Sequence, residues 1–251
     1  MSSIEDTSFI DYIRKKGINI CNTVHVMNKN YIDEKKIIEQ IHIIGEFHKI
    51  ARDYNGFDVK NIKNKIGKLV GQYKIQEKNL KKYAAIKEKS NELTMFDEYF
   101  LSTYKGVIKR CEKCLNYISD DKYIQIIKRG MRNNDICLGN CYFDNLWKDK
   151  ELCIVDYSDV AFNMVEIDGI KFLNKLKINN FDFDFELLID EYILTEGIER
   201  ESENFMKALI SFPVEYIKCV ERYQRNTDKD LEDKFTAKLN KAIRKDGESI
   251  I

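Results

Sequence analysis

Apolar residues recur every three or four positions along most of the chain, which is the spacing of one helix face. The segment 34–52 is the clearest case, because Ile37, Ile41, Ile44 and Phe47 all fall on one face. The same pattern predicts helices over residues 9–16, 60–88, 93–118, 121–131, 165–176, 185–195, 199–211, 213–224 and 228–245, of which the second could be two helices. Thr94 stands where an N-cap is expected, and Pro213 fits the first turn of a helix.

The period changes in the middle of the sequence. Short apolar runs at 136–138, 145–147 and 152–155 are typical of strands, and the polar residues 148–151 predict a hairpin turn between the last two. A single proline and 11 glycines in 251 residues are too few for the many turns of an all-β protein. The sequence therefore predicts a mainly α fold with a small β-hairpin.

Composition excludes several function classes. The 42 Lys and Arg residues balance 42 Asp and Glu, so binding to nucleic acid through bulk charge is not expected. No apolar run reaches the length of a membrane span. Glu5 and Asp6 and the lack of an apolar stretch near the first residue give no indication of a signal peptide, so the seven cysteines are expected to be reduced in a cytosolic compartment.

The stretch ICLGNCYFDNLW at 136–147, followed by LCIVDY at 152–157, is where specific chemistry can be predicted. Its order of strand, loop, Asn, hairpin and Asp resembles the catalytic segment of kinase-like phosphotransferases, whose loop has the pattern H-x-D-x-x-x-x-N. The resemblance implies that Asn145 and Asp156 occupy the two metal-binding positions. Asn140 then stands at the base position and Leu138 at the loop His position. An Asn amide accepts no proton at neutral pH, so a general-base contribution of about 10²- to 10⁴-fold would be lost.

The resemblance extends over roughly residues 34–245, and the chain resembles the CotS family of spore coat proteins, kinase-like relatives of aminoglycoside and choline phosphotransferases. Asp168, three residues before Lys171, matches an Asp that opens the helix after the metal-binding strand. Further matching segments are GEFHKIA at 45–51 with Gly56 and Phe57, ELTMFDEYF at 92–100, and ISFPVEYI at 210–217 continuing to Tyr223. Their co-occurrence in order carries the resemblance.

The resemblance implies that residues 34–251 form the C-terminal lobe of a protein-kinase-like, aminoglycoside phosphotransferase-like fold. Residues 1–33 would be a reduced N-terminal remnant, with a short helix at 9–16 and a strand at 23–27. No glycine-rich loop is found, since Gly17 is the only glycine before Gly45, and no strand there offers a Val-Ala-Ile-Lys-like lysine. Mg²⁺ normally takes much of its coordination shell from phosphate oxygens, which this chain has little means to hold. A Mg²⁺ site at Asn145 and Asp156 would therefore be vestigial.

These expectations describe a catalytically inactive pseudokinase with no catalytic residues and no cofactor. The family implies that it is made in the mother-cell cytoplasm, laid onto the forming spore coat, and bound to other spore coat proteins. The alternative is a weak small-molecule phosphotransferase that binds ATP and Mg²⁺ through Asn145 and Asp156.

The cysteines suggest two other kinds of site. A C-x₂-C and a C-x₃-C pair could form a zinc site with four thiolates, from Cys111, Cys114, Cys137 and Cys141. This interpretation is disfavoured because the first pair falls inside a predicted helix, with no turn around it.

The second is a nucleophilic cysteine at Cys141. Cys141 lies near Asp144 in the sequence, but no histidine lies close to them. His48, on an apolar helix face, is expected to be a hydrogen-bonded structural residue.

Overall fold

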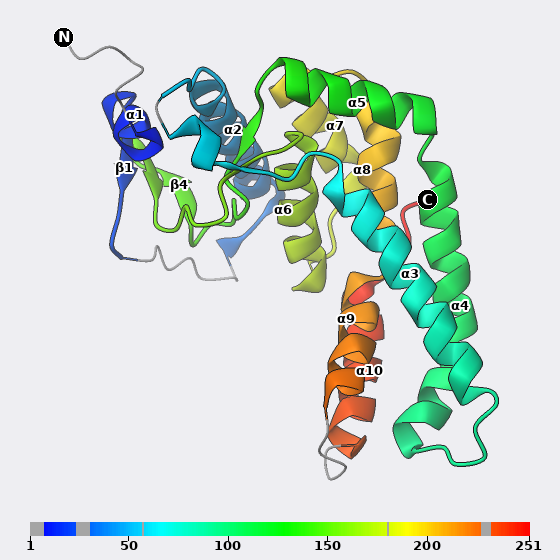
Figure 1. Ribbon diagram of the computed structural model, residues 1–251. Coiled ribbons are helices and arrows are strands. Elements are labelled where there is room, and N and C mark those ends of the chain that lie inside the picture. The colour runs from blue at the N-terminus through cyan, green and yellow to red at the C-terminus, as the bar shows by residue number, and fades with distance from the viewer. Residues whose placement is uncertain (1–7, 24–30, 57, 180, 227–231) are drawn as a thin grey trace. The chain divides into compact units, whose positions relative to one another are not determined.

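The computed structural model describes residues 8–23, 31–56, 58–179, 181–226 and 232–251, and helices dominate it (Figure 1). The chain divides into two compact units. The first comprises Met1–Gly67, Asp120–Lys175 and Phe183–Met206, and the second Lys68–Ser119, Leu176–Asp182 and Lys207–Ile251. The mainly α fold class is confirmed. The boundary predicted after residue 33 separates an N-terminal remnant from a kinase-like lobe. It does not correspond to the division into these two units, and it stays a prediction.

The first unit is built around α2 (Glu34–Ala51), which matches the predicted helix at 34–52. The helix begins at Asp33, whose side chain accepts a hydrogen bond from the Lys36 backbone N–H at 2.8 Å. Its predicted apolar face is fully buried. The other helices of this unit are α1 (Phe9–Lys15), η3 (Val59–Asn61), α5 (Asp120–Arg132), α7 (Phe185–Glu196) and the first parts of α6 (Glu166–Ile178) and α8 (Glu201–Ser211).

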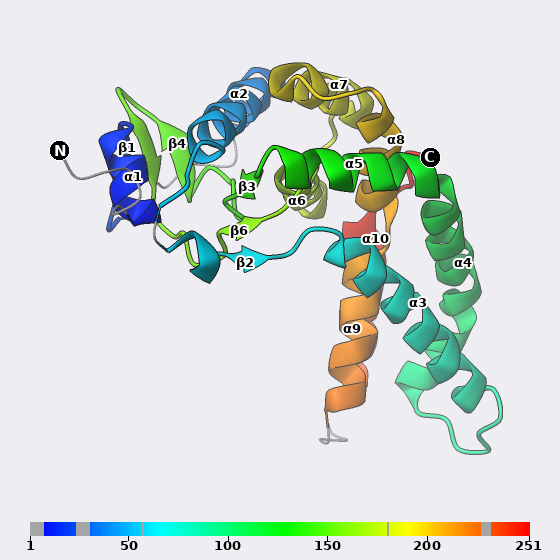
Figure 2. The same cartoon turned by 45° about the horizontal axis from the view of Figure 1, so that its top comes forward.

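Two small sheets complete this unit. The predicted hairpin forms from β4 (Leu146–Lys148) and β5 (Leu152–Ile154), and β1 (Ile18–Ile20) adds to it in parallel with β5. The second sheet has the order β2 (Lys63–Asn64), β6 (Ala161–Phe162) and β3 (Ile136–Cys137), which Figure 2 shows side by side. Of these strands, β1, β2 and β6 were not predicted, because runs of two or three residues give no periodic signal.

The strand predicted at 23–27 is not observed where it can be tested. Thr23 lies in a bend, and residues 24–27 lie outside the described part of the chain. The strand that does form near this end is β1, whose Ile18 is buried while Asn19 is exposed.

A glycine sets the spacing of α6 and α7. A Cβ atom at Gly169 would lie 2.7 Å from the ring of Tyr192, which is fully buried and donates a hydrogen bond to the Val165 carbonyl at 2.6 Å. A buried, hydrogen-bonded ring has no room to move, so only glycine permits this approach.

The second unit packs four helices: α3 (Lys68–Lys87), α4 (Met95–Tyr117), α9 (Val214–Arg225) and α10 (Glu232–Asp246). Figure 1 shows α3 and α4 side by side. Aromatic rings fill the space between elements of this unit, with Tyr73 stacked on Phe212 and Phe96 stacked on Tyr223 at centroid distances of 4.1 and 3.8 Å.

Caps fix the ends of two of these helices. The predicted N-cap Thr94 forms a capping box with Asp97, which Lys87 also contacts at 2.7 Å. The start of α9 has Pro213 before it and no capping side chain of its own. Asp246 at the end of α10 takes that role by accepting hydrogen bonds from the Glu215 and Tyr216 backbone N–H groups, both at 2.8 Å. None of the described helices is both long and apolar enough to cross a membrane.

Candidate functional site

The loop that follows β3 holds the residues that resemble a kinase catalytic segment. A buried glutamine of α2 fixes both ends of this loop, because the Gln40 side-chain amide donates to the carbonyls of Cys141 and Leu146 at 2.9 and 2.8 Å. Gly139, with φ +91°, adopts a conformation that side chains disfavour, and a Cβ there would lie 2.7 Å from Asp159. The loop is therefore held in one shape by neighbours far away in the sequence.

Asn145 connects this loop to the end of the hairpin. Its Nδ2 donates to the carbonyls of Asn140 and Asp156, each at 2.8 Å, and its Oδ1 accepts from the Asp156 backbone N–H at 2.7 Å. The side chain is buried, and these partners fix which atom is the oxygen. Both ends of the amide are thus bound to backbone groups.

Asp156 itself points to solvent. Its Oδ1 accepts a hydrogen bond from the Ser158 backbone N–H at 2.8 Å, and this bond lowers the pKa of the Asp156 carboxyl. The carboxylate is therefore ionised and accessible. A cation shared by the two residues would have to use the second lone pair of the Asn145 oxygen, beside the hydrogen bond from the Asp156 N–H. The assignment of the two residues as a vestigial metal site stays a prediction.

The positions of the base and the loop histidine carry no acid or base. The Asn140 side chain is half-buried and its Oδ1 accepts from the Tyr142 backbone N–H at 3.4 Å. Leu138 is buried, and its backbone N–H donates to Asp168 Oδ2 at 2.7 Å. The structure gives neither side chain a group that could take a proton.

Asp168 is the centre of a buried polar network. Besides Leu138, it accepts from the Gly139 N–H at 3.0 Å, and its Oδ2 lies 3.2 Å from His48 Nε2. The other ring nitrogen of His48 lies 2.6 Å from Glu196 Oε1. His48 is thus a hydrogen-bonded structural residue, as predicted, and it links α2 to α6 and α7.

The network is charged. Burial by itself would lower the pKa of His48, but the charge of Glu196 and the hydrogen bonds of the two carboxylates raise it well above the ordinary value. Burial would likewise raise the pKa of Asp168, yet the hydrogen bond and the charge of His48 hold it below the ordinary value. We therefore assign an imidazolium between two carboxylates.

Cysteines surround this network. Donor atoms of His48, Cys137 and Asp168 lie within 4.8 Å of one another, a spacing that could hold a metal ion. However, Cys137 donates to the Met164 carbonyl at 3.2 Å and Cys141 lies 3.3 Å from Asp168 Oδ2, so hydrogen bonds already use these donors. Burial raises the pKa of Cys137 to about 12, which disfavours the thiolate that a metal needs.

The four-cysteine zinc hypothesis gains no support from the geometry. Cys111 and Cys114 lie within α4 of the second unit, as the sequence predicted, while Cys137 and Cys141 belong to the first unit. Burial raises the pKa of both thiols of the first pair, and both residues lie in continuous helix with no turn beside them. Cys141, which the sequence disfavours as a nucleophile, is buried as well.

A second buried charge cluster had no sequence signal. Arg129 of α5 donates through one terminal nitrogen to both carboxylate oxygens of Glu166 at 2.6 Å, and its other terminal nitrogen donates to Ser202 at 3.3 Å and Glu199 at 3.2 Å. Arg129 and Glu166 are both buried. Their separation by 37 positions explains why no local pattern revealed them.

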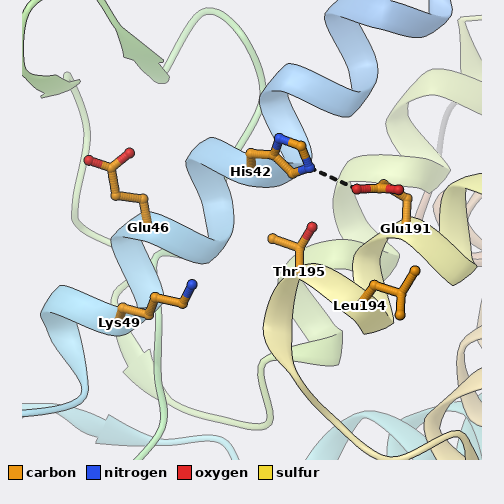
Figure 3. Close-up of a pocket in the computed structure, with 6 residues that line it drawn as sticks. All are labelled: His42, Glu46, Lys49, Glu191, Leu194 and Thr195. Carbon is orange, nitrogen blue, oxygen red and sulfur yellow. Dashed lines mark hydrogen bonds and ion pairs between the residues drawn. The ribbon is translucent and has the colours of Figure 1, made fainter.

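A shallow groove lies between α2 and α7 (Figure 3). It has a volume of about 480 Å³, and at one end His42 Nε2 lies 2.7 Å from Glu191 Oε1. Its lining residues are His42, Glu46, Lys49, Glu191, Leu194 and Thr195. None of them belongs to the kinase-like loop.

Comparison with known proteins identifies the family. A sequence profile described as "Spore coat putative kinase YutH" matches residues 17–250. The chain belongs to this spore coat family. The predicted membership in a kinase-like spore coat family is confirmed, and Asn140, Asn145 and Asp156 of this YutH-family chain lie inside the matched region.

Solved structures confirm the fold. The crystal structure of an aminoglycoside phosphotransferase from Alicyclobacillus acidocaldarius is similar with a TM-score of 0.70, over 95% of this chain and 78% of that chain. The sequence identity is 11%, so this likeness establishes the fold alone. An uncharacterized protein of Plasmodium falciparum (isolate 3D7) is 25% identical over 224 residues, which are 88% of this chain and 18% of that protein. The chain thus spans less than a fifth of that relative's length.

The role of Asn145 can be tested by its effect on stability. We expect Asn145→Ala to lower the free energy of unfolding by about 2 kcal/mol in the absence of Mg²⁺, because three backbone groups lose their partners. Asp156→Ala removes an exposed side chain and should stay within about 0.5 kcal/mol of the wild type. Urea denaturation of both variants in EDTA measures this, and equal effects would contradict a structural role for Asn145.

Proposed function

We propose that this YutH-family chain is a kinase-like spore coat protein that does not transfer phosphate and that works through contacts with other spore coat proteins. The observation that carries the proposal is the state of Asn145. In the resembled segment this residue offers an oxygen to a metal ion, and here one of the two lone pairs of that oxygen accepts the Asp156 backbone N–H at 2.7 Å.

The base position supports the same conclusion. Asn140 replaces the aspartate of the H-x-D-x-x-x-x-N pattern, and an amide cannot take the proton of an acceptor hydroxyl. The lost contribution is about 10²- to 10⁴-fold in rate. The printed sequence also contains no Gly-x-Gly spacing, so the glycine-rich loop that covers phosphates in this class has no counterpart among these residues.

The family supports a spore coat setting. We infer that the chain is made in the mother-cell cytoplasm and laid onto the forming spore, where its helical units serve as a scaffold for protein contacts. This role needs no cofactor. The buried networks around His48 and Arg129 would then serve only to hold the lobe in shape.

A weak small-molecule phosphotransferase is the second candidate. Asp156 favours it, because its carboxylate is ionised and exposed at the end of the hairpin strand. If Mg²⁺ were bound there, it would neutralise phosphate charge. This chain's own contribution would be positioning alone, since the residue at the base position accepts no proton.

Restoring the base separates the two candidates. We expect the Asn140→Asp variant to show no more γ-phosphate release from Mg²⁺–ATP, and no more ³²P incorporation, than the wild type, because the sequence still lacks the glycine-rich loop that covers the phosphates. Asp156→Ala serves as the background control. The contradicting result is phosphate release at least tenfold higher in Asn140→Asp than in the wild type, and lost again when Asp156→Ala is added to that variant. It would show that only the base is missing, and the phosphotransferase candidate would replace the main proposal.

A further inference from the structure

We propose that Cys21 and Cys153 are a site of oxidative modification, at which a small-molecule disulfide such as oxidised glutathione converts the two thiols into a disulfide that joins β1 to β5. The inference concerns chemistry outside the kinase-like loop and does not depend on phosphotransfer.

The register of the parallel strands places the two side chains on one face. Asn19 is paired with Cys153, and the Cys21 backbone N–H donates to the Ile154 carbonyl at 2.8 Å, so the ladder continues past the end of β1. Side chains alternate along a strand, so Cys21 returns to the face of Asn19 and hence to that of Cys153.

A neighbouring pair shows that contact across this diagonal is made. Asn19 Nδ2 donates to Glu151 Oε2 at 2.7 Å. Along β1, Asn19 lies two residues after the position opposite Glu151. In the same way, Cys21 lies two residues after Asn19, which is opposite Cys153. The offset is the same, and a hydrogen bond with the Cys21 side chain contributes to the raised pKa of Cys153. Cysteine side chains are shorter than those of Asn19 and Glu151, so an S–S bond needs the chain after Ile20 to move toward β5 until the two Cα atoms lie within about 7 Å of each other.

Access to solvent favours reaction at this pair. All seven cysteines lie in the described part of the chain, and among them Cys21 alone is half-buried while the rest are buried. Cys153 is 8% exposed. An oxidant can therefore reach Cys21 directly, whereas Cys153 is reached most easily by its neighbour.

The reaction proceeds by two thiol–disulfide exchanges. The Cys21 thiolate attacks one sulfur of oxidised glutathione, the S–S bond of glutathione breaks, and one glutathione leaves as a thiolate. Cys153 then loses its proton to solvent and attacks the Cys21 sulfur, which releases the second glutathione. The two protein thiols lose two electrons, and one oxidised glutathione becomes two reduced molecules. Burial raises the pKa of Cys153 to about 11, so the second exchange becomes faster as the pH rises.

Alkylation and peptide mapping test the proposal on the full chain. After incubation with oxidised glutathione at pH 8 and alkylation in denaturant, we expect five of the seven cysteines to be alkylated, since two are lost together. The digest should contain one disulfide-linked peptide pair that joins residues 21 and 153 and disappears with dithiothreitol. Because the bond closes a long loop of the unfolded chain, Tm should rise by about 5–10 °C.

Two variants make the result specific. Cys21→Ser should keep all its remaining thiols under the same conditions, while Cys219→Ser, altered in the second unit, should still form the linkage. A glutathione adduct that persists at Cys21 beside an alkylatable Cys153 would overturn the proposal. A linkage between two chains, or no loss of thiols at all, would overturn it as well.

Discussion

Replacing His48 with alanine is expected to lower the free energy of unfolding by about 3–5 kcal/mol. The imidazolium lies between Asp168 and Glu196, and the side chains of all three residues are at most 1% exposed. Without it, two carboxylates remain buried with no cation beside them, and α2 loses its polar link to α6 and α7. Urea denaturation monitored by circular dichroism measures the loss.

His42→Ala is the matched control, because His42 lies on the same helix and also contacts a glutamate, but its side chain is 56% exposed. We expect a change within about 0.5 kcal/mol. The pH dependence gives a second check. The folded-state pKa of His48 is raised, so its stabilising contribution is fully present below the ordinary value of 6.5 and is lost as the pH rises through the folded-state pKa. A His48→Ala protein as stable as His42→Ala would refute the charged network.

Replacing Arg129 with methionine is expected to cost a similar 3–5 kcal/mol, for the same reason in the other charge cluster. Glu166 is fully buried and receives two hydrogen bonds of 2.6 Å from this guanidinium. Methionine keeps an unbranched apolar stem but carries no charge, so the Glu166 carboxylate would stay in the core without its cation. Chemical denaturation at pH 7 measures the difference.

Arg132→Met on the same helix is the control, because Arg132 is exposed. It should change the free energy of unfolding by less than about 0.5 kcal/mol. Equal stability of Arg129→Met and Arg132→Met would show that the buried ion pair of Arg129 and Glu166 does not stabilise the folded protein.

Much of the helical framework was predictable from local sequence. The face of α2, the N-cap at Thr94 and the turn between β4 and β5 each depend on residues within a few positions of one another, and each was predicted correctly. The parallel pairing of β1 with β5 was not predicted, because it joins Ile18 to Leu152 through a run of three residues. Short strands of this kind are stabilised by the partner strand rather than by their own pattern.

The site was predictable in part. The resemblance placed Asn145, Asp156 and Asp168 in one region, and its family and fold are confirmed. The sequence could not show that the Asn145 oxygen accepts the Asp156 N–H, because an amide can present either end to its surroundings. It also gave no sign that Glu196 completes the His48 network, since the two residues are 148 positions apart.

The most direct test of the central claim is a thermal-shift titration of the purified chain with Mg²⁺ and ATP, run beside Asp156→Ala. A ligand that binds the native state at a hundred times its Kd adds about 2.7 kcal/mol to the apparent stability, which corresponds to a rise in Tm of about 5–10 °C. We expect no shift in either protein at millimolar nucleotide. A Mg²⁺-dependent rise in the wild type that disappears in Asp156→Ala would contradict the proposed function and show that the site still binds the nucleotide.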